Sequence, residues 1–393
     1  MLDAPQGPSL VLLVGAGLLI RSFAKLLETN PGFRPDHVLT MNVPLPYPGY
    51  SKAAEIRGFY HQVLERVENF PGVKSAGISN DLPMSHTETD ILQVEGQQGS
   101  TPAIRVTWAL GNYLQTMGIP LLRGRGFTPE DRAGSQPVVL VSLEAAKLLW
   151  PGEDALGKRI RGGGVGGNPP WMTVVGIVGD VKDGPMNEAA KPHVYLPYLQ
   201  LSDKLVEDQV INEARSMNVA VRTANDPASM TSAVTGVIHS VDAGIPIAKV
   251  RTMEQDISAS VAGPKFNTFL LGLFAFLALF LAAIGIYGVL AYTVTQQTHE
   301  IGIRIALGAQ QRDVMRLVLG QGTKLALAGV GIGVLAALGL TRLMAPSLYG
   351  VSANDPLTFA VVSIVLVGVA LLACYIPARR AMRVDPMIAL RYE

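Results

Sequence analysis

The sequence contains one cysteine, Cys374, so no disulfide can form within the chain. Its 32 lysine and arginine residues are balanced by 31 aspartate and glutamate residues, which leaves a net charge of +1. The basic residues form no run, and so small a net charge creates no field that would draw nucleic acid to the surface. We therefore expect no nucleic-acid partner.

The sequence also lacks the usual signatures of a catalytic or metal site. It has no His-Glu-x-x-His and no Gly-x-Ser-x-Gly motif, so we expect no enzyme activity, no cofactor and no metal in this chain. Residues 152–158 nearly spell a phosphate-binding loop, but Arg159 stands where the motif requires Ser or Thr, and we interpret the segment as a turn. His86, Glu88 and Asp90 could share one face of a strand, although the polar segment around them is typical of a solvated loop.

Charged residues are missing altogether from three long stretches, residues 266–298, 325–341 and 357–378. A helix needs about 20 apolar residues to cross a bilayer, and such stretches do not arise by chance where 16% of residues are charged. A fourth apolar stretch, residues 9–20, is shorter, but the long side chains of Arg21 and Lys25 after it can reach the interface. We predict an α-helical membrane protein with four transmembrane helices.

Basic residues indicate how these helices are oriented. The loop 296–324 carries Arg304, Arg312, Arg316 and Lys324, and the tail 379–393 carries Arg379, Arg380, Arg383 and Arg391. Because cytoplasmic loops are enriched in Lys and Arg, both segments are predicted to be cytoplasmic. The large segment between the first and second apolar stretches then lies outside.

That segment, residues 28–264, has the composition and pattern of a mixed α/β domain. Strands are predicted at 37–45, 73–79, 137–142, 172–181, 193–198, 218–222 and 247–251, and helices at 51–70, 143–149 and 227–241. A β-α-β rhythm occurs near its start and again near its end. We expect an extracytoplasmic α/β domain of two related lobes, the second split by an insertion, between helices 1 and 2.

Two further patterns concern helix contacts. Gly329 with Gly333, and Ala278 with Ala282, are small residues four apart, a spacing that favours close helix packing within the chain or across a dimer. Residues 300–309 form a short amphipathic piece that ends at Gly308. It could rest on the lipid headgroups, or it could present apolar side chains to a cytoplasmic partner, with Glu300 and Arg304 one helical turn apart.

Residues 300–309, Glu-Ile-Gly-Ile-Arg-Ile-Ala-Leu-Gly-Ala, and the ending 377–393 resemble the cytoplasmic signatures of MacB/FtsX-type ABC transporter permeases. Gly124-Arg125-Gly126-Phe127 and the segments 156–160 and 174–181 are similar to that family's extracytoplasmic domain. The resemblance spans essentially the whole chain. Residues 11–23, followed by 31–35, also resemble the C-terminal half of longer tandem permeases.

The resemblance implies a division into residues 1–27, a short N-terminus with helix 1; 28–264, a MacB-like periplasmic core; and 265–393, an FtsX-like permease domain. It implies a permease subunit in the bacterial inner membrane that transmits the ATP-driven motion of a partner ATPase to the outer domain for efflux. Partners would be a cytoplasmic ABC ATPase, a second permease or second copy, the lipid bilayer and a periplasmic adaptor. The implied coupling residues are Glu300, Ile301, Gly302, Ile303, Arg304, Ile305, Leu307 and Gly308.

Two other functions fit the same architecture. The chain could be a transmembrane regulator of a cell-envelope enzyme or a ligand sensor. It could also be a membrane-anchored enzyme that uses loops of the outer domain, such as the one with His86 and Glu88.

Overall fold

The computed structural model describes residues 6–85, 89–99, 101–162, 169–184, 186, 188–201, 203, 214–297, 303, 310–343 and 348–381. Contacts divide the chain into two compact units. Residues 30–262 form one, which we call the α/β unit. Residues 1–29 and 263–393 form the other, the helical unit.

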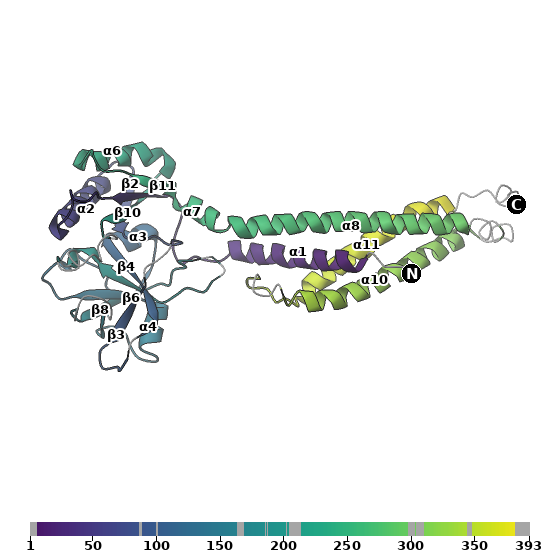
Figure 1. Cartoon of the computed structure of the whole chain (residues 1–393), viewed down its shortest axis with the longest axis horizontal. Helices are drawn as coiled ribbons and strands as arrows, with labels where there is room; N and C mark the ends of the chain where they lie inside the picture. Colours follow the sequence, from purple (N-terminus) through teal and green to yellow (C-terminus); the bar gives the residue numbers. More distant parts are fainter. Residues whose placement is uncertain are drawn as a thin grey trace. The chain divides into compact units, whose positions relative to one another are not determined.

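The α/β unit is built on two β-α-β segments that share one sheet. The first comprises β1 (Val38–Pro44), α2 (Ala53–Glu68) and β2 (Val73–Ser79), and the second comprises β10 (Ser216–Thr223), α6 (Thr231–Val241) and β11 (Ala248–Thr252). Their strands lie in the order β11-β1-β10-β2 with antiparallel neighbours. This is the ferredoxin-like arrangement, in which α2 and α6 cover the same side of the sheet (Figure 1).

The expectation that each β-α-β segment forms its own lobe is therefore wrong. The two segments interlock, because β10 inserts between β1 and β2 and β11 adds to the free side of β1. The second lobe consists instead of the chain inserted between β2 and β10. Sequence periodicity shows that a strand exists, but strand order depends on pairing between distant segments.

The inserted chain closes a ring of strands. It contains β3 (Thr89–Val94), β4 (Ala103–Gly111), α3 (Tyr113–Met117), β5 (Leu121–Gly124), β6 (Val138–Ser142), α4 (Leu143–Leu149), β7 (Arg159–Gly162), β8 (Met172–Val178), β9 (His193–Pro197) and η1 (Tyr198–Gln200). Pairing runs β4-β3-β7-β8-β6-β9 and returns to β4, while β5 pairs with β8. One end of β4 also pairs with β2, so this strand belongs to both layers.

The hydrophobic core follows these layers. Ile56 and Val63 of α2 and Val234 and Ile238 of α6 are fully buried against the ferredoxin-like sheet. A second cluster, made largely of apolar side chains of the ring strands, fills the inside of the ring. At the centre of the first cluster the Tyr60 hydroxyl lies 2.7 Å from the Val43 carbonyl oxygen and accepts a hydrogen bond from the Met217 N–H. Burial raises the pKa of Tyr60 well above its ordinary value, so the phenol stays neutral.

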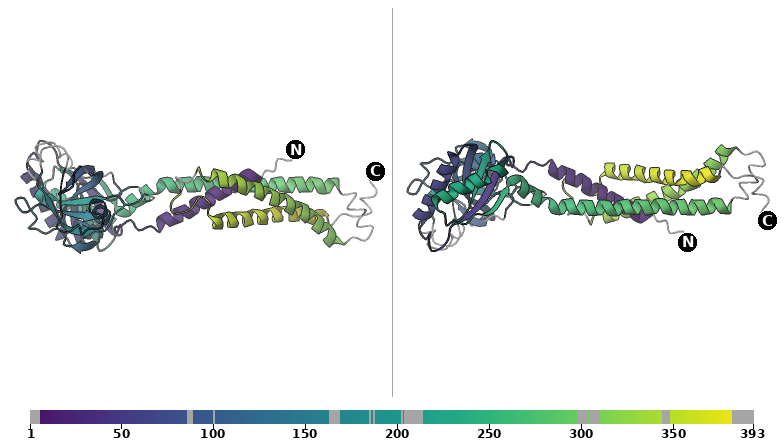
Figure 2. Two further views of the ribbon diagram at one scale, coloured as in Figure 1. Left: turned by 90° about the horizontal axis from the view of Figure 1, so that it is seen from below. Right: turned by 90° about the horizontal axis from the view of Figure 1, so that it is seen from above.

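The helical unit contains four long helices among the described residues: α1 (Gln6–Leu27), α8 (Ala262–Gln296), α10 (Gln311–Leu340) and α11 (Pro356–Ala381) (Figure 2). Three described segments are long and apolar enough to cross a membrane: Ser9–Leu27, Ala262–Gln296 and Pro356–Arg379. In α10 the apolar stretch is the shorter Leu327–Leu340. The predicted count of four spans therefore stays a prediction.

α8 is the longest of these helices. It follows the short helix α7 (Met253–Ser260), and only Val261 lies between the two. Its 35 residues correspond to about 52 Å at about 1.5 Å per residue. A bilayer core is roughly 30 Å thick. If α8 spans the membrane, it extends beyond the hydrocarbon layer.

A glycine substitution tests how tightly β2 packs on α3. A Cβ atom at Gly77 would lie 2.3 Å from the Tyr113 Cα, a backbone atom that cannot move aside. We expect Gly77→Ala to lower the free energy of unfolding by about 2–3 kcal/mol, measured by thermal unfolding of the full chain in lipid nanodiscs. Gly126→Ala is the matched control, because no atom lies within 4 Å of the added Cβ there. Equal melting of the two variants would contradict this packing.

Candidate transmission site in the helical unit

α1 packs on α10 along a seam of small residues. Gly329, Gly333 and Ala337 are four residues apart, so they share one face of α10, and all are buried. Leu10 of α1 occupies the space beside Gly333, where an added Cβ would lie 2.8 Å from the Leu10 Cβ. Glycine here allows the two helix backbones to approach closely.

A second small residue brings α1 against α11. A Cβ atom on Gly17 would lie 2.9 Å from the Thr358 Cγ2 atom, so these helices also meet closely. Apolar residues complete the contact, with Leu10, Val14 and Leu18 of α1 fully buried beside Val362 and Leu366 of α11. α1 therefore packs on both α10 and α11.

The second predicted pair, Ala278 and Ala282, lies on α8. Ala282 is buried and Ala278 is half-buried. Further along the same helix, Ile286 and Leu290 pack with Ala370, Cys374 and Ala378 of α11. Most of the remaining surface of α8 is apolar and exposed, as expected for a helix in contact with lipid: Phe266, Phe269, Phe274, Phe276, Phe280 and Leu281.

Polar contacts fix the C-terminal end of α1 to the chain before α11. Arg21 pairs with Asp355, and Lys25 donates to the Gly350 carbonyl oxygen. The Ser22 hydroxyl accepts a hydrogen bond of 2.7 Å from the Tyr349 N–H. We call this set the polar clamp. Arg21 and Lys25 were recognised in the sequence as interfacial charges, but their acceptors, more than 300 residues away, were not.

Asp355 also caps α11. Its Oδ2 atom accepts hydrogen bonds from the Thr358 N–H at 3.0 Å and from the Thr358 hydroxyl at 2.6 Å. These bonds, together with the nearby Arg21, hold the pKa of the Asp355 carboxyl below its ordinary value. The same carboxylate thus joins the helix cap to α1.

The predicted coupling segment lies between α8 and α10. Glu300, Ile301, Gly302, Arg304, Ile305, Leu307 and Gly308 lie outside the described residues. Ile303 is described; it is helical, and its side chain is 40% exposed. The coupling role of these residues stays a prediction.

In the α/β unit, a buried polar chain links β4 to β9. His193 lies 2.8 Å from the Thr107 hydroxyl through Nε2 and 3.0 Å from the Asp183 carboxylate through Nδ1. Arg105 lies 3.5 Å from the same carboxylate, and the His193 ring stacks on Tyr195 with centroids 4.3 Å apart. The residues around His193 in the sequence form no recognisable motif, and no local spacing pointed to these partners.

The segment that resembles a phosphate-binding loop folds as the predicted turn between α4 and β7. Lys158, which would contact a phosphate in such a loop, forms an ion pair of 2.7 Å with Glu153. The neighbouring Asp154 pairs with Arg123 at 2.7 Å. Lys158 is therefore paired within the turn, and Asp154 is paired with Arg123 of β5. His86 and Glu88 lie outside the described residues.

The sequence matches two family models, which follow one another along the chain. Residues 10–238, more than half of the chain, match the MacB-like periplasmic core domain, and residues 272–386 match the FtsX-like permease C-terminal domain. The chain belongs to the MacB-like permease family. In this MacB-like permease, the periplasmic core match begins within α1.

Curated relatives are longer than this permease. The macrolide export ATP-binding/permease protein MacB of Hahella chejuensis is 30% identical over 289 residues, which cover 72% of this chain and 42% of the relative. The pyoverdine export ATP-binding/permease protein PvdT of Pseudomonas savastanoi pv. phaseolicola is 26% identical over 275 residues, which cover 70% of this chain and 40% of the relative. The chain thus spans less than half the length of these relatives.

Among solved structures, part of the chain is similar to the periplasmic region of MacB from Actinobacillus actinomycetemcomitans. The identity is 18%, the TM-score is 0.39, and the match covers 60% of this chain and 98% of that one.

The seam predicts a sharp contrast between two neighbouring glycines. Gly333→Val should separate α1 from α10, because its side chain would collide with Leu10, whereas a Cβ atom added at Gly331 has no atom of another helix within 4 Å among the described residues. We expect Gly333→Val to lower the free energy of unfolding by about 1–3 kcal/mol and Gly331→Val to unfold at the same temperature as the natural protein. Thermal unfolding in lipid nanodiscs measures both. If both variants melted alike, the seam would not hold α1.

The polar clamp predicts a pH dependence. A carboxyl group whose pKa is lowered on folding stabilises the fold fully at pH values above its unfolded pKa of about 3.9. That stabilisation is lost as the pH falls through the lower pKa of the folded state. We expect Asp355→Ala to cost about 1 kcal/mol at neutral pH, with a difference that shrinks below about pH 4. Arg21→Ala removes only the ion pair and should lower the free energy of unfolding by about 0.5 kcal/mol. A difference for Asp355→Ala that is constant from pH 7 to pH 3 would contradict this.

Proposed function

We propose that the chain is the permease subunit of an ABC exporter, and that it transmits the motion of a separate cytoplasmic ATPase to its α/β unit. The observation that carries the proposal is the order of the two family matches, with an inserted periplasmic core followed by an FtsX-like permease domain. Both named relatives are export proteins whose names include an ATP-binding part. Neither matched model is an ATPase domain, so in this proposal a partner supplies ATP hydrolysis.

The proposal includes a topology. α1, α8, α10 and α11 are the four spans, with the α/β unit outside the bacterial inner membrane. The basic segment 296–324, which includes the first half of α10, and the basic tail 379–393 face the cytoplasm, in keeping with the enrichment of Lys and Arg in cytoplasmic segments.

Residues Glu300 to Ala309 serve as the coupling element. Ile301, Ile303 and Ile305 insert into a groove of the ATPase, and Glu300 and Arg304 set the orientation. The exposed side chain of Ile303 supports this assignment.

The helical unit supports transmission of motion more than conduction of a substrate. The described middles of α8 and α11 consist of apolar and small residues, while ion or proton pathways normally require charged groups within the membrane. Close contacts at Gly17 and Gly333 join α1 to its neighbours. A displacement of α10 or α11 would therefore move α1 and the chain that continues from it, because closely packed side chains have little room to absorb the movement.

The functional unit in this proposal is a pair of permeases, either two copies or two related chains, together with two ATPases and a periplasmic adaptor. The names of the two relatives specify macrolide export and pyoverdine export. We propose efflux of a compound of that general kind.

Co-purification tests the coupling role. The natural protein, extracted from its own membranes in mild detergent, should carry an ABC ATPase, and a variant with Ile301, Ile303 and Ile305 changed to Asp should lose it, because charged side chains cannot enter an apolar groove. Gly331→Val is the folded control. An ATPase retained by the triple variant would refute the coupling role, and an inserted natural protein without any ATPase would refute the exporter.

A further inference from the structure

A shallow hollow of about 280 Å³ opens on the surface of the α/β unit, on the side of α2 away from the sheet. Its described lining consists of Arg57, Gly58 and His61 of α2, Arg132 and Ala133 before β6, and Leu199 of η1. The Ala133 N–H donates to the Leu199 carbonyl oxygen at 2.8 Å, which ties two of these walls together.

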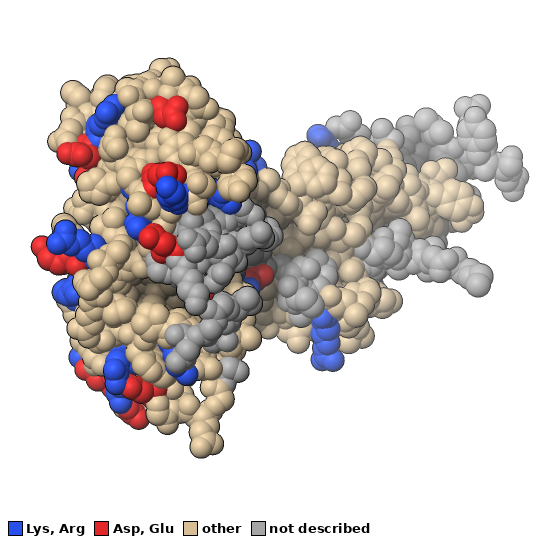
Figure 3. All heavy atoms as spheres, turned by 60° about the vertical axis from the view of Figure 1, so that its left-hand side comes forward, with Lys and Arg blue, Asp and Glu red and all other residues tan. Residues whose placement is uncertain are grey.

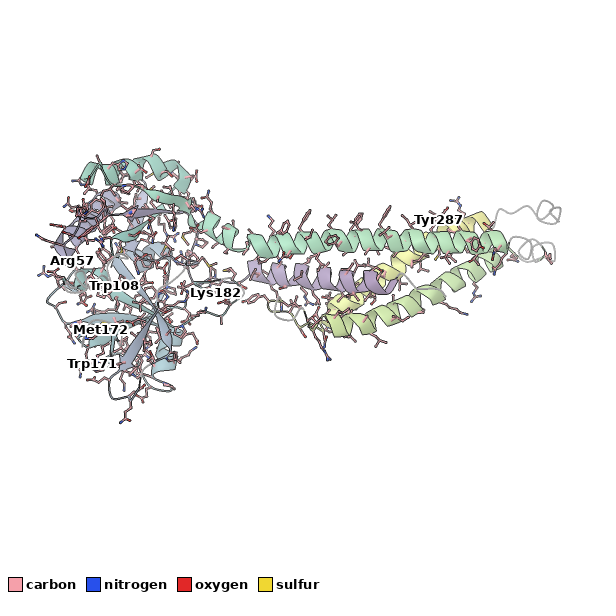
Figure 4. The ribbon with its side chains drawn as sticks, viewed as in Figure 1. Arg57, Trp108, Trp171, Met172, Lys182 and Tyr287 are labelled. Atoms are coloured by element: carbon pink, nitrogen blue, oxygen red, sulfur yellow. The ribbon has the colours of Figure 1, made fainter. Side chains whose placement is uncertain are left out.

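The α2 wall is held rigidly. The opposite face of this helix is in the core, where Ile56 and Tyr60 are fully buried. Arg57, labelled in Figure 4, donates to the Leu201 carbonyl oxygen and pairs with Asp203 at 3.2 Å. A guanidinium has five N–H donors, so two described bonds fix Arg57 in place and leave donors for a ligand.

The charged residues that line the hollow are all basic, and the carboxylate of Asp203, which pairs with Arg57, lies outside the lining. The described lining contains two arginines and a histidine and no carboxylate. The α/β unit also contains ion pairs such as Arg123–Asp154 and Lys158–Glu153. On the face drawn in Figure 3, basic and acidic side chains lie beside one another. Arg132 is exposed and makes no ion pair with any described residue.

The floor of the hollow is apolar and has free space. Gly58, Ala133 and Leu199 carry no polar side-chain atoms, and no atom lies within 4 Å of a Cβ added to Gly58. A volume of about 280 Å³ is just below the usual range for drug-sized ligands. The hollow thus combines cationic donors at its rim with room for a small apolar group.

We propose that this hollow binds a small amphiphilic carboxylate, with its head between Arg57 and Arg132 and its apolar part over Gly58 and Leu199. A planar guanidinium matches a carboxylate through two parallel hydrogen bonds, and this geometry favours the carboxylate head. The site is independent of the ATPase partner, so it stands whether or not the exporter function is correct.

Saturation-transfer NMR on the full chain in lipid nanodiscs tests the site, with para-butylbenzoate as the probe and empty nanodiscs as the background. We expect saturable binding of the benzoate and binding of the neutral para-butylbenzamide that is weaker by about fivefold or more. Equal binding of the amide would overturn the role of the arginines. Tighter binding of para-butylphenyl phosphate would overturn the choice of a carboxylate.

Two pairs of variants locate the site. Gly58→Leu should fill the hollow and abolish saturable binding. Gly236→Leu, at an exposed helix position that also has open space beside it, should leave binding unchanged. Arg132→Gln should weaken binding about two- to fivefold, while Lys74→Gln, an exposed cation outside the hollow, should not. Binding that survives both Gly58→Leu and Arg132→Gln, or no saturable binding to the natural protein, would overturn the proposal.

Discussion

The close approach of α1 to α10 is the contact on which the helical unit depends. The whole α/β unit separates α1 from α8, α10 and α11 in the sequence, so only non-covalent contacts keep it among them. Gly333 allows Leu10 to approach, and Gly17 does the same for Thr358. The polar clamp then fixes the C-terminal end of α1. A helix fixed along one side and at one end can transmit a displacement, which is what the proposed function requires.

In the α/β unit a single strand, β4, joins the parts of the structure. β4 pairs with β2 at one end, with β3 at the other and with β9 along its middle, so the ferredoxin-like sheet and the ring share a backbone. The buried chain of Thr107, His193, Asp183 and Arg105 crosses the β4–β9 contact. Buried polar groups are costly unless paired, so this chain favours one pairing of these strands. The two layers therefore cannot separate without breaking backbone and side-chain hydrogen bonds.

The hollow beside α2 and the seam in the helical unit show two uses of glycine. At Gly333 a neighbour fills the space that a side chain would take, and the glycine permits contact between helices. At Gly58 the space is open, and the glycine leaves room beside two arginines. Both are glycines inside a helix, and the sequence around them does not tell the two cases apart. Only the position of the facing element decides which of the two applies.

The sequence by itself determined the family, the apolar segments and most of the regular elements of the α/β unit. α2 lies where hydrophobic periodicity predicts a helix, because its apolar residues recur on one face and that face is buried in the core. The sequence missed the strands β3, β4, β5 and β7 and the helices α3 and α7, and it assigned the two β-α-β segments to separate lobes. Strand order, the closure of the ring and the partners of Arg21, His193 and Arg57 were decided by the tertiary structure alone. Each depends on a contact between residues far apart in the chain, and local spacing carries no information about such a contact.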